Sequence, residues 1–299
     1  MKSSQLTTHN SRLKLSEFII EKLILWSGIA SIIFVILIFV FLLKEGASLF
    51  RTESTIHFIS GKFWYPISTP PRFGILALLM GSLWVTLGAV LISVPLGLGS
   101  AIFIGEILPR GLRDYFKSGV ELLAAIPSVV LGFVGLVTLV PFVKYLFNLR
   151  SGLTVLSGSI MLAFMAMPTI VSIIEDALNA VPKNYREGSL ALGATRWQTI
   201  YRVVIPAASP GILAGVMLGV GRVIGETMAV MMLTGNAAIL PKSFFDPART
   251  MTATIAAEMG EAVQGSSHYS ALFAIGIVLF LITFLVNLVA DFFLHRRKL

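Results

Sequence analysis

Residues 203–233 read VVIPAASPGILAGVMLGVGRVIGETMAVMML and contain only two charged side chains, Arg222 and Glu226. Ser209 followed by Pro210 is typical of a helix N-cap with proline at the first helical position. We therefore expect one apolar helix from residue 210 to about residue 233, with both charges near its middle. A turn at residues 222–226 would instead divide the stretch into two helices.

The rest of the chain contains further long apolar stretches. Five stretches without Asp, Glu, Lys or Arg could each hold a membrane-crossing helix of about 20 residues; they are 23–43, 73–105, 122–143, 151–174 and 262–290. The chain is 56% hydrophobic and 13% charged, whereas a soluble domain has about 25% charged residues. The sequence thus predicts an all-α integral membrane protein with six transmembrane helices, and argues against a water-soluble enzyme.

Lysine and arginine are distributed unevenly between the two sides of this arrangement. With six spans, 14 of the 23 basic residues lie on the side that holds both termini, and 8 lie on the other side. Because basic residues favour the cytoplasm, we expect both termini to be cytoplasmic. The net charge of +8 then reflects topology and requires no nucleic acid. A seven-span arrangement gives a weaker asymmetry, but charge counting alone does not exclude it.

The predicted organisation follows from these spans. Residues 1–22 form an N-terminal cytoplasmic tail, 23–43 the first transmembrane helix, and 44–72 an outer segment too rich in proline for one helix. Residues 73–291 form the main transmembrane domain, including a polar cytoplasmic region at 175–206, and 292–299 form a basic cytoplasmic tail. Within the fifth span, Gly211, Gly215 and Gly219 recur every four residues, which favours close approach of another helix.

Arg222 and Glu226 are the unusual pair, because a charge at the bilayer centre is costly and often marks a pathway. On one helix their spacing would place them on the same face. They could form an internal ion pair, or Arg222 could bind a tetrahedral oxyanion through paired hydrogen bonds. Thr227 could assist, although hydroxyls in membrane helices mostly bond to their own backbone.

The polar region between the fourth and fifth spans predicts a short helix, a turn and a second short helix. Pro182 is typical of a first helical turn, and Gly193 of a left-handed C-terminal cap. Thr195 and Gln198 have the spacing of a capping box, and we expect the second helix to end before Pro206. This unit could lie at the membrane interface or dock a cytoplasmic partner.

This region resembles the EAA motif of ABC importer permeases. That motif reads Glu-Ala-Ala, three residues, Gly, nine residues, Ile, one residue and Leu-Pro. The chain matches it at Glu187, Gly193 and Pro206 and departs at Gly188 and Ser189, where alanines are usual. The resemblance implies the fold of a type I ABC importer permease with a coupling helix between the fourth and fifth spans. It also implies ATPase coupling by a set of residues within 187–206: Glu187, Gly193, Ala194, Thr195, Arg196 and Pro206.

Residues 221–230, GRVIGETMAV, with Gly235 and Asn236, are similar to the signature of PstC-type permeases of phosphate-specific ABC importers. The resemblance implies a bacterial inner-membrane location, a periplasmic 44–72 segment, and a phosphate pathway containing Arg222, Glu226 and Thr227. The implied partners are a homologous PstA-type permease, two cytoplasmic ATPase subunits, a periplasmic or lipid-anchored phosphate-binding protein, and membrane lipid. The ATPase subunits would use ATP and magnesium, and this chain would bind no cofactor.

The chain's own residues agree with a transport subunit rather than an enzyme. No P-loop motif GxxxxGK[ST] or metalloprotease motif HExxH occurs in the sequence, and no catalytic or metal-ligating constellation is predicted. Glu258 and His268 are expected to be solvated. Three alternatives stay open: another tetrahedral oxyanion such as sulfate or molybdate, a proton-coupled secondary transporter, and a membrane scaffold with a structural Arg–Glu pair.

Overall fold

The computed structural model describes residues 3–51 and 53–296, and these residues are almost entirely helical. Six helical segments among them are long and apolar enough to cross a membrane, which agrees with the predicted number of spans. They are Glu17–Arg51, Leu76–Ile107, Ser128–Leu146, Val155–Asn179, Arg196–Gly225 and Ser267–Val289. The last three residues of the predicted basic tail, 297–299, lie outside the described residues.

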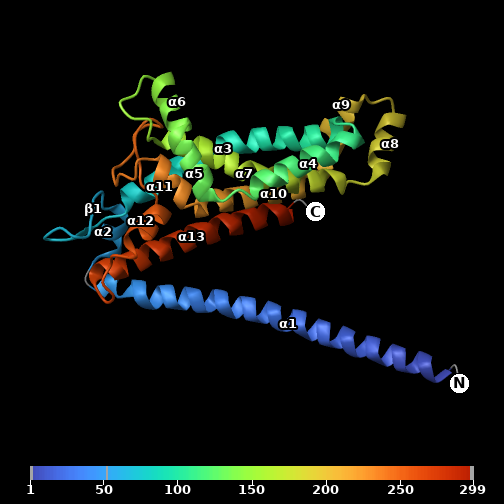
Figure 1. The fold of residues 1–299 in the computed structure, drawn as a ribbon, viewed down its shortest axis with the longest axis horizontal. Coiled ribbons are helices and arrows are strands. Elements are labelled where there is room, and N and C mark those ends of the chain that lie inside the picture. Colours follow the sequence, from blue (N-terminus) through green and yellow to red (C-terminus); the bar gives the residue numbers. More distant parts are fainter. Residues whose placement is uncertain (1–2, 52, 297–299) are drawn as a thin grey trace.

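Helices α3 (Leu76–Ile102), α7 (Val155–Asn179) and α10 (Ile205–Gly225) form the centre of the bundle (Figure 1). Buried aliphatic side chains from α3, α7 and α10 and from neighbouring segments form the largest apolar core of the described residues. Gly211, Gly215 and Gly219 of α10 face α7: a β-carbon on Gly211 would lie 2.3 Å from Ala177 Cβ, and one on Gly219 would lie 2.4 Å from Ile170 Cγ1. The expectation of close helix packing along this face is confirmed.

The fifth span begins earlier than expected. Helix α9 (Arg196–Thr199) continues through a π-helical turn at Ile200–Val204 directly into α10. The prediction that one helix stops before Pro206 and another starts at Pro210 is wrong. In the wider π turn the Ile205 amide donates to the Ile200 carbonyl, and this widening accommodates Pro206, which has no amide hydrogen of its own.

The fifth span also ends earlier than expected, at Gly225 instead of about residue 233. Glu226 has extended backbone angles (φ −69°, ψ 134°), and the short helix α11 (Met228–Leu233) begins two residues later. The chain therefore breaks close to the turn that the seven-span alternative required, yet it does not form a seventh span.

Helices α1 (Ser3–Ala47) and α13 (Ser267–Arg296) lie outside the central bundle. They meet through aromatic contacts, with the Phe39 and Phe280 ring centroids 4.7 Å apart. From this contact α1 runs away from the bundle (Figure 1), and the side chains of its apolar span are exposed. In a bilayer these side chains would face lipid or a partner helix.

One end of the molecule, here called the hairpin end, carries small elements in place of a long helix. These are a 3-10 turn (Leu49–Arg51), α2 (Thr55–Ser60) and an antiparallel pair of strands, β1 (Trp64–Tyr65) and β2 (Arg72–Phe73). Helix α12 (Met251–Glu258) ends beside them, and its Glu258 carboxylate accepts from Trp64 Nε1 at 2.9 Å.

Glu258 and His268 are not solvated, contrary to expectation. The Glu258 carboxylate lies 2.6 Å from an Arg249 guanidinium nitrogen and 2.9 Å from His268 Nε2. All three side chains are at most 20% exposed. This cluster joins three segments of the hairpin end, so its evident role is structural.

The opposite end, here called the α8 end, carries the beginning of α4 (Arg110–Ala124) and the whole of α8 (Lys183–Ala191) and α9. α1 begins and α13 ends toward this same side (Figure 1). Helix α4 leads back through Pro127 into α5 (Ser128–Val137) and α6 (Leu139–Leu146), which together form the third span. The arrangement keeps the predicted grouping of both termini with the second and fourth connections.

Candidate functional site

Arg222 lies in the last turn of α10 with an exposed side chain. Its Nη1 donates to Thr169 Oγ1 on α7 at 3.2 Å. Thr169 lies near the middle of α7, so the guanidinium sits far from both ends of the bundle. Among the described residues, Arg222 forms no ion pair with a carboxylate.

Glu226 does not share a helical face with Arg222, because the helix ends between them. Its carboxylate instead accepts the Ala229 amide at 3.4 Å, at the start of α11. The neighbouring Thr227 hydroxyl donates to the Gly225 carbonyl at 3.2 Å, a local backbone bond of the kind expected for a membrane hydroxyl. The prediction that Arg222 and Glu226 share one helical face is therefore wrong, and the internal ion pair, one of the two alternatives, does not form in this conformation.

Most N–H donors of Arg222 therefore have no hydrogen-bond partner among the described residues, and its side chain is exposed at the surface of the bundle. A guanidinium presents five N–H donors in a planar fork that matches the oxygens of carboxylates and phosphates. One weak bond to a threonine hydroxyl leaves that fork available, whereas an ion pair with Glu226 would have occupied it. The arrangement is suited to a passing anion.

The turn between α8 and α9 is capped as the sequence predicted. Gly193 has φ +84°, and the Gly193 and Ala194 amides donate to the Leu190 and Ser189 carbonyls, which is a Schellman ending for α8. At α9, Thr195 and Gln198 exchange reciprocal bonds, so the expected capping box is confirmed.

The turn between the two helices exposes its apolar side chains. Leu192 is 91% exposed and Trp197 is 62% exposed, and Glu187 also faces outward. Apolar groups held this far out by a rigid turn are typical of a docking surface. Gly193, Ala194, Thr195 and Arg196 lie in or beside this turn, and Pro206 lies further along, at the start of α10.

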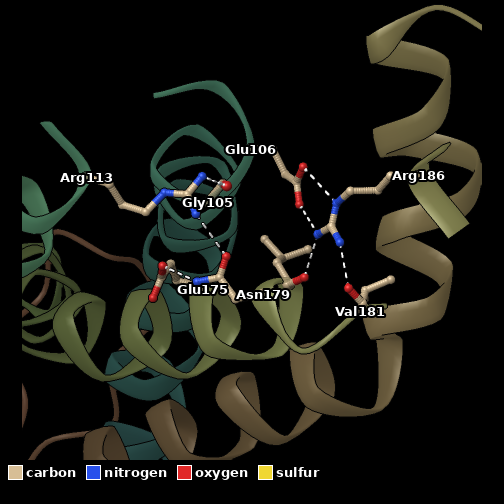
Figure 2. A network of polar contacts seen from close by, with 8 residues as sticks. Gly105, Glu106, Arg113, Glu175, Asn179, Val181 and Arg186 are labelled. Atoms are coloured by element: carbon tan, nitrogen blue, oxygen red, sulfur yellow. Dashed lines mark hydrogen bonds and ion pairs between the residues drawn. The ribbon is translucent and has the colours of Figure 1, made fainter. Parts of the chain in front are cut away.

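A network of polar side chains at the α8 end was not predicted from the sequence (Figure 2). Arg113 of α4 donates to the Gly105 carbonyl and, at 3.1 Å, to Asn179, which in turn donates to Glu175. Glu175 is only 2% exposed, although the sequence places it at the start of the polar cytoplasmic region at 175–206. The charges come from distant parts of the chain, so no local spacing could have indicated that they meet.

Lys117 of α4 joins the same network. Its ammonium lies 2.7 Å from Asp176 and 2.8 Å from Glu175. The hydrogen bonds that the Lys117 ammonium donates to Asp176 and to Glu175, the former having the larger effect, raise the pKa of Lys117 above its ordinary value. Lys117 therefore stays charged at neutral pH and fixes α4 to the end of α7.

The two carboxylates bound by Lys117 should contribute unequally to stability. Glu175 has a side chain that is 3% exposed, and Asp176 one that is 67% exposed. We expect Glu175→Ala to lower the free energy of unfolding by about 3 kcal/mol, because it removes the buried carboxylate that accepts from both Lys117 and Asn179. Asp176→Ala should cost about 1 kcal/mol or less, since its pair is solvent-screened. Denaturant unfolding of the purified chain in detergent measures both, and equal losses would contradict the assignment.

No group of three or more His, Asp or Glu side chains suited to a metal ion occurs in the part of the chain that the structure describes. The candidate site therefore has two parts. One is the exposed Arg222 of α10, which contacts Thr169 of α7 near the middle of the bundle, and the other is the α8–α9 unit at the α8 end.

Comparison with known proteins places this architecture among transporters. Residues 93–299 match the family described as "Binding-protein-dependent transport system inner membrane component". The chain is 44% identical over 245 residues to "Probable ABC transporter permease protein YqgH" of Bacillus subtilis, covering 82% of this chain and 79% of that protein. It is 40% identical over 258 residues to "Phosphate transport system permease protein PstC" of Mesorhizobium japonicum, covering 80% and 78%.

Solved structures show the same fold at lower identity. A chain of a bacterial ABC transporter involved in the import of alginate matches with a TM-score of 0.63 and 18% identity, covering 95% of this chain and 99% of that one. A chain of the methionine ABC transporter MetNI matches with a TM-score of 0.57 and 20% identity, covering 72% and 92%. At this identity the likeness establishes the helical arrangement only.

Proposed function

Because the chain belongs to the family of binding-protein-dependent transport system inner membrane components, we propose that it is the transmembrane permease subunit of an ATP-driven importer of inorganic phosphate. It is a multi-pass inner-membrane protein with the fold of type I ABC importer permeases. It is a transport subunit and not an enzyme.

The substrate assignment is supported by the relatives and by Arg222. Several proteins at 34–40% identity are named phosphate transport system permease protein PstC. An exposed guanidinium near mid-bundle offers a doubly charged oxyanion a counter-charge where lipid and apolar side chains offer none. Its single weak bond to Thr169 favours transit, because a deep multidentate site would retain the anion.

Glu226 and Thr227 belong to the same proposed pathway through their position beside the break after α10. The Glu226 carboxylate faces the start of α11, so a modest movement of this break could bring it toward Arg222 after phosphate leaves. Thr227 contributes its hydroxyl if its bond to the Gly225 carbonyl opens. Both roles are secondary to that of Arg222.

The proposed assembly pairs this chain with a homologous PstA-type permease, two cytoplasmic ATPase subunits and an external phosphate-binding protein. The family description names a binding protein, and an alginate relative was crystallised with its substrate-bound periplasmic protein. The α8 end, with both chain termini directed toward it, would face the cytoplasm. ATP and magnesium would bind only to the ATPase subunits.

In the proposed cycle, ATP binding closes the ATPase subunits and moves the α8–α9 unit. The permeases then open outward, and phosphate released by the binding protein enters the pathway past Arg222. Hydrolysis and product release return the permeases to the inward-open state. This chain's part is to provide the pathway and to transmit the movement.

Substitution of Glu187 tests the docking role of the α8–α9 unit. We expect Glu187→Trp to reduce the amount of ATPase subunit that copurifies by roughly tenfold, since a bulky side chain on an exposed docking face should cost about 1.4 kcal/mol of binding free energy. Glu261→Trp, an exposed glutamate at the hairpin end, is the matched control and should leave copurification unchanged. Full copurification with normal transport in Glu187→Trp would argue against docking there.

A pull-down in mild detergent tests the whole assignment. A tagged copy of the chain should recover a second permease and an ATPase subunit in stable amounts. Recovery of the chain alone, or only of copies of itself, would favour a secondary transporter or a scaffold over the proposed importer.

A further inference from the structure

Arg186 stands beside the exposed Glu187 but points the other way, into the end of the bundle (Figure 2). Its Nη2 lies 2.5 Å from Glu106 Oε1, in a pair whose side chains are 23% and 11% exposed. The same guanidinium donates to the Leu178 carbonyl at 2.8 Å and to the Val181 carbonyl at 2.6 Å. One side chain of α8 therefore binds the end of α3 and the end of α7 together.

Each partner is placed to receive a cation. Glu106 lies in the π-helical turn Phe103–Ile107 that ends the second span, and Leu178 and Val181 lie at the C-terminal end of α7. Carbonyls at a helix C-terminus lack intrahelical donors and carry the negative end of the helix dipole. The Arg186 guanidinium can therefore pair with the Glu106 carboxylate and donate to the α7 carbonyls at the same time.

Helix α8 has few other attachments to the bundle. None of its residues is buried, and its other side-chain bond outward is between the Ser189 and Thr199 hydroxyls, 3.1 Å apart, which only links it to α9. A force applied to the exposed turn at Leu192 would thus reach the fifth span along α9, whereas α8 itself is tied to the ends of α3 and α7 by Arg186. Without it, α8 could pivot on the short link after α7.

We propose that the Arg186–Glu106 pair is a positioning latch that makes the α8–α9 unit move as one body with the second and fourth spans. The latch rests on the proposed function, because it explains how movement of a docked ATPase reaches the pathway. Arg186 touches neither phosphate nor nucleotide and acts through α3 and α7. Breaking the latch should let the ATPase turn over while the permease fails to follow.

Transport stoichiometry tests the latch in the reconstituted importer with its partner permease, ATPase and binding protein. We expect Glu106→Gln and Arg186→Gln each to lower the phosphate imported per ATP hydrolysed by about tenfold, a typical size for allosteric coupling. ATPase copurification and the phosphate concentration for half-maximal uptake should not change. Arg186→Lys keeps the positive charge but loses the planar guanidinium, so its ratio of phosphate imported to ATP hydrolysed should lie between those of Arg186→Gln and the wild type.

Glu258→Gln is the matched control, because the Arg249–Glu258 pair has a similar distance of 2.6 Å and similar burial at the opposite end. Glu258→Gln should lower thermal stability and leave the amount of phosphate imported per ATP hydrolysed unchanged. A wild-type ratio in Glu106→Gln and Arg186→Gln, with only a lower yield of complex, would overturn the latch and leave a purely structural pair.

A spectroscopic measurement tests the latch independently of transport. The sequence has no cysteine, so spin labels can be attached specifically at Leu192→Cys on the exposed turn and Ser118→Cys on α4. Pulsed electron–electron double resonance on the purified chain should give a narrow distribution of distances between the two labels. This distribution should broaden with Glu106→Gln but not with Glu258→Gln. An unchanged width with Glu106→Gln would contradict the latch even if phosphate proved not to be the substrate.

Discussion

Arg222→Gln is expected to reduce phosphate uptake about 100-fold while the importer still assembles, because it removes a charge contact that the anion makes during transit. Glutamine keeps hydrogen-bonding groups and approximate length but removes the counter-charge that the anion needs in a medium of low dielectric. Uptake of radiolabelled phosphate by cells that lack other phosphate importers measures the effect. Copurification of the ATPase shows that the complex has formed.

Two further variants make the Arg222 result specific. Arg222→Lys retains the charge without the planar fork and should give intermediate uptake. Arg51→Gln removes an exposed arginine at the hairpin end and should transport normally. Wild-type uptake by a correctly assembled Arg222→Gln importer would refute the proposed pathway role.

Gly211→Leu is expected to have the second largest effect, through packing. The Ala177 Cβ atom that faces Gly211 cannot rotate away, so a side chain there must push α10 off α7. Overpacking of this kind costs about 3 kcal/mol or more, and we expect little folded protein to survive purification. Thermal unfolding and yield in mild detergent measure the loss.

Gly221→Leu provides a matched comparison within the same helix. No atom lies within 4 Å of a β-carbon built on Gly221, and leucine is a better helix former than glycine by about 0.8 kcal/mol. We expect unchanged or slightly higher thermal stability. Equal destabilisation by both substitutions would show that the α10–α7 contact does not limit stability.

Features of the fold that depend on local sequence were predictable. The number of spans follows from apolar length, the glycine face of α10 from a four-residue spacing, and the Gly193 and Thr195 caps from short motifs. Each is determined by residues a few positions apart. The same holds for the exposed α8–α9 unit.

Features that depend on tertiary contacts were not predictable. No proline marks the break after Gly225. Pro206 and Pro210 do suggest a break, yet Pro206 follows a π turn and Pro210 lies within the continuous helix α10. The partners of Arg186, Glu175 and Glu258 come from remote helices. Polar residues that looked solvated or mutually paired are held instead by neighbours that only the fold brings near.

The central claim is that this chain forms a phosphate pathway driven by ATP, and uptake by proteoliposomes containing the purified importer tests it most directly. With ATP inside and the binding protein outside, radiolabelled phosphate should accumulate, unlabelled sulfate or molybdate should not compete, and uptake should stop when ATP is withheld. Phosphate accumulation that continues without ATP, or a preference for another oxyanion, would contradict the account.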